Sequence, residues 1–223
     1  FSPILQSFGG DLIDRSDYQT AQGVLNGPKA VKAMTWFQQL FKQGYANPEP
    51  DGDDAFYGRK TAALALVGLW MWPAHHQALG DDLVLLPMPK FGPRHVASMG
   101  NWNWGITSSC PYPAQAWAFI EFIHRPESVL RVSKVTGGVP SRKSAAAQSK
   151  LYAQGGPLHL YVEQLNRIAL ERPVTPAYPV ITRAFAEAVH NIIAGADVQT
   201  QLNIAVRKID KEIKDNKGYP VLE

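Results

Sequence analysis

The sequence predicts a mixed α/β fold in which short strands come early and long helices come late. Three short apolar runs, at residues 61–67, 83–88 and 102–107, lie between turn-rich segments, as expected for strands. Beyond the glycine pair at 155–156 the pattern is almost entirely helical. No internal repeat interrupts this order, so we expect a mixed sheet flanked by helices, with a helix-rich C-terminal half.

The clearest predicted helix covers residues 28–42. Pro28 suits a first helical turn, and Gly44 can supply the left-handed residue that ends the helix. Similar signals predict helices over 113–124, from Pro126 onward, and over 158–170, 180–194 and 198–214. In the helix at 113–124 we expect an inward-facing apolar stripe made of Trp117, Ile120, Phe122 and Ile123.

Composition excludes several classes of protein. The 223 residues are 45% apolar and 18% charged, enough to bury a sizeable core. The net charge is +3, and the densest run of lysines, at 208–217, alternates with acidic residues, which is typical of a solvated helix face and not of a nucleic-acid site. The single cysteine, Cys110, excludes an intrachain disulfide.

The most apolar stretch, residues 62–74, contains a glycine and a proline, and it is shorter than the roughly 20 residues that a bilayer requires. We therefore expect no membrane-spanning segment. The first residues lack a basic, then apolar, export signal, so we expect any such signal to lie upstream of Phe1.

Two glycine-led turns each present a pair of tryptophans: Gly68 precedes Trp70 and Trp72, and Gly100 precedes Trp102 and Trp104. A sugar ring has an apolar face of C–H groups, which stacks on a flat indole, and an equator of hydroxyls, which needs polar partners. The alternative is that these tryptophans belong to the core. Alternation along a strand would turn one member of each pair inward.

Motifs for catalysis and metal binding are weak. The Ser108–Ser109–Cys110 loop lacks the Gly-x-Ser-x-Gly turn of a nucleophile. His75 and His76, with Asp81 and Asp82 nearby, lack a metal-binding spacing, and we expect them on a solvated helix surface. We predict no catalytic residue, no metal and no cofactor.

Several segments, in order, resemble the extracellular solute-binding proteins that include the maltose and trehalose receptors. They are residues 7–13 (SFGGDLI), 58–63 leading to 68–72 (GLWMW), 85–89 (LLPMP), 100–106 (GNWNWGI), 138–142 (GVPSR) and 172–178 (RPVTPAY). The resemblance runs along nearly the whole chain. It implies the second lobe of a type II periplasmic-binding-protein-like fold.

The resemblance also implies a ligand site. Trp70 and Trp102 would be stacking platforms, and Arg142 and Tyr178 would donate hydrogen bonds. Further members of the implied site are Gly100 and Asn101, where the family presents backbone amides, and Phe185 as an additional apolar wall. Asn101 departs from the glycine usual at its position, and this adds a side chain to the cleft.

By the same resemblance, residues 1–95 and 145–223 would build the second lobe. Residues 96–144 would return the chain through the hinge and complete part of a first lobe that is otherwise absent here. The implied function is that of the carbohydrate-binding, non-enzymatic component of an ABC import system. Its ligand would be a disaccharide or oligosaccharide, and its partner a membrane permease. The implied protein is a monomer, periplasmic or extracellular, either free or lipid-anchored.

Other functions remain open at this stage. A carbohydrate-active enzyme would need two carboxylates facing each other across a groove, and no acidic residue lies beside the tryptophan turns. A non-sugar solute such as glycerol phosphate, or a plain interaction domain, would also agree with the composition.

Overall fold

The computed structural model of the chain describes residues 1–48, 54–100 and 102–219. It contains two compact units. Unit 1 comprises Phe1–Pro50, Met88–Met99 and Ile168–Glu223, and unit 2 comprises Asp51–Pro87 and Gly100–Arg167. These bounds differ from those of the predicted lobes, since residues 51–87 and 145–167 group with 100–144. Which lobe each unit corresponds to remains a prediction.

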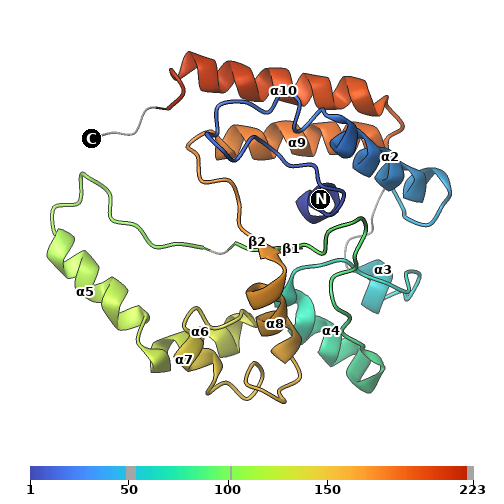
Figure 1. Ribbon diagram of the computed structural model, residues 1–223. Helices are drawn as coiled ribbons and strands as arrows, with labels where there is room; N and C mark the ends of the chain where they lie inside the picture. The colour runs from blue at the N-terminus through green and yellow to red at the C-terminus, as the bar shows by residue number, and fades with distance from the viewer. Residues whose placement is uncertain (49–53, 101, 220–223) are drawn as a thin grey trace. The chain divides into compact units, whose positions relative to one another are not determined.

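Unit 1 is built around two long helices, α9 (Tyr178–Ile193) and α10 (Val198–Asp215), which run side by side (Figure 1). Gly195, with φ +99°, and the N-cap Asp197 make the turn between them. Each helix places apolar residues three and four apart on the face toward its neighbour. The fully buried members of this interface are Ile181, Val189, Ile192, Leu202, Val206 and Ile209.

Two N-terminal helices complete this core, α1 (Ser2–Ser7) and α2 (Pro28–Lys42). The bounds of α2 are the predicted ones, and Pro28 occupies the first turn, where its missing N–H costs nothing. Gln38 of α2 is buried, and its Nε2 donates to the carbonyl oxygens of Ile192 and Ala196, both at 2.8 Å. This amide thereby satisfies carbonyl groups at the C-terminal end of α9.

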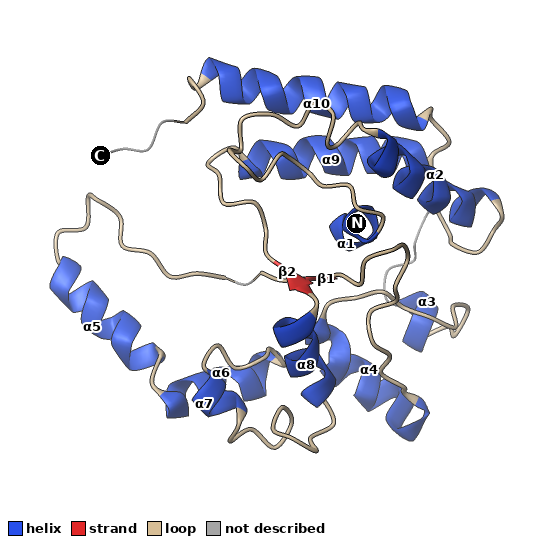
Figure 2. Cartoon of the chain, in the orientation of Figure 1, coloured by secondary structure: helices blue, strands red, loops and turns tan. Residues whose placement is uncertain are grey.

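The sheet of the described residues consists of two very short strands, β1 (Ala97–Ser98) and β2 (Ala169–Leu170), shown in red in Figure 2. They are parallel, and Ala97 lies opposite Ala169. The backbone N–H of Met99 extends the ladder by donating to the carbonyl of Leu170 at 3.1 Å. The pair joins two distant parts of the sequence within unit 1.

Unit 2 is made of short helices: α3 (Asp54–Tyr57), η1 (Leu69–Met71), α4 (Trp72–Leu79), η2 (Gly80–Asp82), α5 (Pro113–Ile123), α6 (Pro126–Thr136), α7 (Lys143–Ala146) and α8 (His159–Arg167). Its buried side chains are few and are contributed mainly by α6, α7 and the following turns. Tyr152 is fully buried, and its hydroxyl donates to the carbonyl of Gly137 at 2.5 Å. Gly137 ends α6 in the left-handed conformation, at φ +68°.

The structure confirms the helix-rich C-terminal half and corrects the prediction of strands. Within the described residues, 61–67, 83–88 and 102–107 form no strand, and the sheet is small and parallel instead of mixed. The reason is that a strand needs a neighbour to satisfy its backbone groups. The inward-facing stripe predicted in α5 is also wrong, since Trp117 is 55% exposed and the helix buries no residue.

Candidate ligand-binding site

Unit 1 contains a cavity of about 180 Å³ beside the paired strands. Its wall combines apolar groups of α1 with the ends of β1 and β2 and the segment that leads to α9. The polar and aromatic members of the lining are Phe1, Ser2, Gln6, Ser98, Glu171, Arg172 and Tyr178. Such a mixture of aromatic and hydrogen-bonding groups is typical of sites for small polar ligands.

A hydrogen-bonded network fixes the backbone of this wall. Arg15 Nε donates to Asp11 Oδ2 at 2.6 Å, and an Arg15 terminal nitrogen donates to the carbonyl of Glu171 at 2.9 Å. Gln6 Nε2 donates to Asp11 Oδ1 at 3.0 Å. Because Arg15 joins Asp11 to Glu171, the segment leading to Arg172 is held against the N-terminal part of unit 1.

Tyr178, a predicted site residue, lies in this cavity wall at the start of α9. The Arg172 guanidinium carbon is 6.0 Å from the centroid of the Tyr178 ring, at the outer limit of a cation–π contact. Arg172 therefore covers the ring from one side. The segment 172–178 is part of the family resemblance, but no pattern in the sequence indicates that Arg172 and Gln6 line a common wall.

Phe185 does not contact the cavity. It is only 6% exposed and packs in the hydrophobic core of unit 1. It lies seven residues after Tyr178, about two helical turns along α9, on the face that is buried against the rest of the unit. Phe185 is therefore a core residue in this structure, and its contact with a ligand stays a prediction.

In unit 2, Trp70 lies in η1 and is 66% exposed. Its indole folds back over Gly68, because a Cβ built on Gly68 would lie only 2.1 Å from the ring. Pro73 and Trp70 also lie beside Gly137, at the end of α6. Because Gly68 has no side chain, the Trp70 indole can pack against the backbone there, while most of the indole surface stays exposed to solvent.

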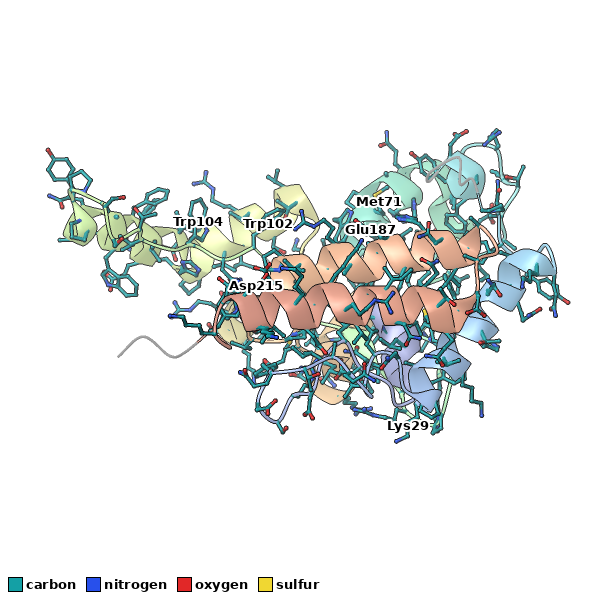
Figure 3. The ribbon with its side chains drawn as sticks, turned by 90° about the horizontal axis from the view of Figure 1, so that it is seen from above. Lys29, Met71, Trp102, Trp104, Glu187 and Asp215 are labelled. Atoms are coloured by element: carbon teal, nitrogen blue, oxygen red, sulfur yellow. The ribbon has the colours of Figure 1, made fainter. Side chains whose placement is uncertain are left out.

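The second tryptophan turn is also exposed. Trp102 is 96% exposed, and Trp104 packs edge-on against Phe119 of α5, with ring centroids 5.9 Å apart (Figure 3). Gly100 is exposed at the start of the same segment. Asn101 lies outside the described residues. The alternative that these tryptophans are core residues does not hold for Trp70, Trp102 or Trp104 in this structure.

Arg142 precedes α7 and is exposed. One of its terminal nitrogens donates to the carbonyl of His124 at 3.1 Å, just after the end of α5. A guanidinium has five N–H donors, so this bond leaves donors for a ligand. The structure brings Arg142 close to the end of α5.

The histidine pair of α4 departs from the predicted solvated surface. His75 is buried and its ring lies 5.0 Å from Phe56 and 5.1 Å from Tyr57, while His76 is exposed and stacks on Trp72. Among the described residues no group of three or more His, Cys, Asp or Glu side chains is placed to hold a metal ion. His75 is therefore a packing residue of unit 2.

Comparison with known families decides what kind of protein carries these features. A family model described as bacterial extracellular solute-binding protein matches residues 4–156, which is more than half of the chain. The chain belongs to this family. Members of the family are solute-binding proteins of the extracellular or periplasmic space, and they are defined by binding and not by catalysis.

Solved structures agree on the fold, which is type II periplasmic-binding-protein-like. An ABC transporter solute-binding protein from Thermotoga lettingae, solved with α-D-tagatose, is 23% identical with a TM-score of 0.77 and matches 94% of this chain and 55% of its own. A cyclo/maltodextrin-binding protein in complex with maltotetraose is 20% identical, with a TM-score of 0.73, and the match covers 95% of this chain and 56% of that one.

A cyclic α-maltosyl-1,6-maltose binding protein from Arthrobacter globiformis is 25% identical, with a TM-score of 0.64, over 96% of this chain and 55% of its own. The chain therefore spans just over half the length of these solved relatives. Across the described part of the chain, no helix combines the length and apolarity needed to cross a bilayer.

Proposed function

We propose that this chain supplies carbohydrate-binding surfaces to a receptor that delivers a sugar to the membrane permease of an ABC import system. The exposed indole of Trp70, held against Gly68, carries the proposal. An indole in the open on a glycine-led turn can stack on the C–H face of a sugar ring. An indole that stays exposed contributes no stabilisation from apolar burial, and this favours a binding role for it.

The cavity of unit 1 supports the proposal from a different part of the chain. Tyr178 and Arg172 offer an aromatic edge and N–H donors, and Gln6 and Ser98 add further hydrogen-bonding groups. Ligand hydroxyls need such partners because an unpaired hydroxyl in a closed site loses its bonds to water. Trp102, Arg142, Gly100 and Asn101, which belong to unit 2 and not to this cavity, remain proposed ligand contacts.

The proposed ligand is a disaccharide or oligosaccharide, in agreement with the maltotetraose and maltosyl-maltose named for two structures of similar fold. Delivery to the permease would follow closure of two lobes around the ligand, as the family resemblance implies. The proposed receptor is an exported monomer, free or lipid-anchored.

Calorimetric titration with maltose, trehalose, tagatose and maltotetraose tests the proposal. We expect this chain alone to bind weakly, with a Kd on the order of millimolar, because a site with a missing part cannot exclude water. Stacking worth about 0.5 to 1.5 kcal/mol predicts that Trp70→Ala weakens binding roughly 2- to 13-fold. Trp117→Ala, also an exposed tryptophan of unit 2, is the matched control and should leave affinity unchanged.

Two results would contradict the proposal. Equal loss of affinity in both variants would show that Trp70 has no special role, and absence of binding to every sugar at tens of millimolar would remove the carbohydrate class. Binding without turnover is part of the proposal, so release of glucose or maltose from maltotetraose during incubation would favour an enzyme instead.

A further inference from the structure

Gln6 is a buried glutamine in the wall of the unit 1 cavity. It lies in the last turn of α1 and is only 3% exposed. Its amide carries two kinds of hydrogen-bonding atom, an oxygen that accepts and a nitrogen that donates. Which of the two faces the cavity determines which ligand groups can pair with this side chain.

Asp11 fixes the orientation of the Gln6 amide. Gln6 Nε2 donates to Asp11 Oδ1 at 3.0 Å, and the same oxygen accepts from the backbone N–H of Leu12 at 2.8 Å. A carboxylate only accepts hydrogen bonds, so the amide nitrogen, and not the amide oxygen, points to Asp11. Arg15 holds the other carboxylate oxygen, with its Nε 2.6 Å from Oδ2. Asp11 therefore cannot turn away from Gln6 without breaking that ion pair.

The turn between Gln6 and Asp11 depends on two glycines. Gly9 adopts the left-handed conformation, at φ +88°, which is strained for an L side chain. A Cβ on Gly10 would lie 2.9 Å from Leu5 Cδ1 and 3.1 Å from the backbone of α2. The turn therefore packs closely on α1 and α2, and it brings the carboxylate back to a side chain five residues earlier.

The oxygen of the Gln6 amide is a free acceptor in the described part of the chain. Among residues 1–48, 54–100 and 102–219, no group donates to Gln6 Oε1. In the same residues, the one side-chain nitrogen or oxygen that is fully enclosed without a partner is His75 Nε2. Gln6 Oε1 is therefore not enclosed, and the open space that Gln6 lines is the cavity.

We infer that Gln6 is a specificity-determining residue, whose Oε1 accepts a hydrogen bond from a hydroxyl group of the ligand. Arg172 of the same wall can only donate. An acceptor and a donor together suit a hydroxylated ligand, since a hydroxyl both donates and accepts. This role rests on the proposed function, and it adds which atom selects the ligand and by what chemistry.

The size of the cavity limits the occupant. Its volume of about 180 Å³ corresponds to about six water molecules, at ~30 Å³ each. We therefore expect one sugar ring or a smaller polyol to enter the cavity, and not a whole oligosaccharide.

Carbon-13 NMR of the glutamine side-chain carbonyls tests this role on the 223-residue chain. The probes are maltose, tagatose and glycerol, and dimethyl sulfoxide serves as a probe that accepts hydrogen bonds and donates none. The Cδ signal of Gln6 should move with at least one of the hydroxylated probes and stay in place with dimethyl sulfoxide. The Cδ signal of Gln38, a buried glutamine outside the cavity, should not move with any probe.

Substitution measures the effect of Gln6 on affinity. Gln6→Met keeps a side chain of similar length and removes the acceptor. We expect the Kd for the probe that moves the Gln6 signal to rise at least about fivefold, because the ligand hydroxyl loses its acceptor. Gln43→Met makes the same change at an exposed glutamine after α2 and should leave the Kd unchanged. Denaturant unfolding of both variants separates a loss of affinity from a loss of folding.

Three results would overturn the role of Gln6. They are a Cδ signal that stays in place with all three hydroxylated probes at tens of millimolar, an equal shift with dimethyl sulfoxide, and an unchanged Kd in a folded Gln6→Met. If Gln6→Met does not fold, the carbon signals of the wild-type chain decide by themselves.

Failure of the proposed role of Trp70 gives a different result. In that case Trp70→Ala keeps the wild-type Kd, while the Gln6 signal still moves and Gln6→Met still binds more weakly.

Discussion

The two units bury apolar side chains to very different extents. In unit 1, α9 and α10 pack against each other and against α2, α1 packs on α2, and one buried cluster results. In unit 2, the buried apolar residues are few, and α5 contributes none. Amphipathic helices can complete a core with one another, whereas strands and all-apolar helices require further layers of structure. Both units have apolar sequences, but unit 1 buries its apolar side chains in a core of its own, whereas many of those in unit 2 are exposed.

Truncation of the core of unit 1 should have the largest effect. Ile209 is fully buried in α10, so Ile209→Ala should lower the free energy of unfolding by about 2 to 5 kcal/mol. Leu64→Ala truncates a side chain of the same size that is exposed in unit 2. It should change the free energy of unfolding by less than about 0.5 kcal/mol. Denaturant unfolding followed by circular dichroism measures both, and equal losses would remove the contrast between the units.

A buried hydrogen bond of unit 2 offers the next test. Tyr152→Phe leaves the buried Gly137 carbonyl without its donor, at a cost of about 1 to 3 kcal/mol. Burial, with a smaller contribution from Tyr161, raises the pKa of Tyr152 from 10.0 to about 12.

The neutral phenol is thus the form that the folded protein favours. The stabilisation is complete below pH 10 and should be lost as pH rises from about 10 to about 12. The melting temperatures of Tyr152→Phe and wild type should therefore differ at pH 8 and approach each other at pH 11. A constant difference would show that the hydroxyl does not act through this bond.

Gly68→Ala should have a small effect on stability and a clear effect on Trp70. The added Cβ would meet the indole, but an exposed ring can rotate away, so we expect a loss below about 1 kcal/mol. The tryptophan emission and its quenching by acrylamide should change. Gly105→Ala is the control, because a Cβ there meets nothing within 4 Å. Identical spectra for the two variants would mean that Gly68 does not position Trp70.

The smallest effect concerns the N-cap of α10, since Asp197 is exposed. Its side chain accepts from the backbone N–H of Thr200 at 2.8 Å. The side-chain hydrogen bond with Thr200, followed by this backbone bond, lowers the pKa of the carboxyl from 3.8. The cap therefore stabilises unit 1 above pH 3.8 and its contribution is lost as pH falls below that value. Asp197→Ala should melt earlier at pH 7 and approach wild type near pH 3, whereas Asp197→Asn, also a good cap, should not show this convergence.

Much of the fold could be predicted where the signals are local. Prolines in first turns and apolar stripes fix α2, α9 and α10 to within two residues of the predictions, and α6 begins at Pro126 as predicted. The prediction of strands was wrong because the pairing partners of a strand are distant in the sequence. Nothing in residues 61–67 reveals whether a neighbouring strand exists. For the site, exposed glycine-led tryptophans were predictable, but the cavity wall made by Arg172 and Gln6 depends on contacts between distant segments.

The buried amide of Gln38 fixes how insertions and deletions can be tolerated in the N-terminal part of the chain. One residue more or less before Gln38 within α2 would turn its side chain by roughly 100°, away from the carbonyls of Ile192 and Ala196. One buried and one part-buried acceptor would then lose their donor. Natural length variation in homologues should therefore be absent from Pro28–Gln38 and concentrate after the end of α2.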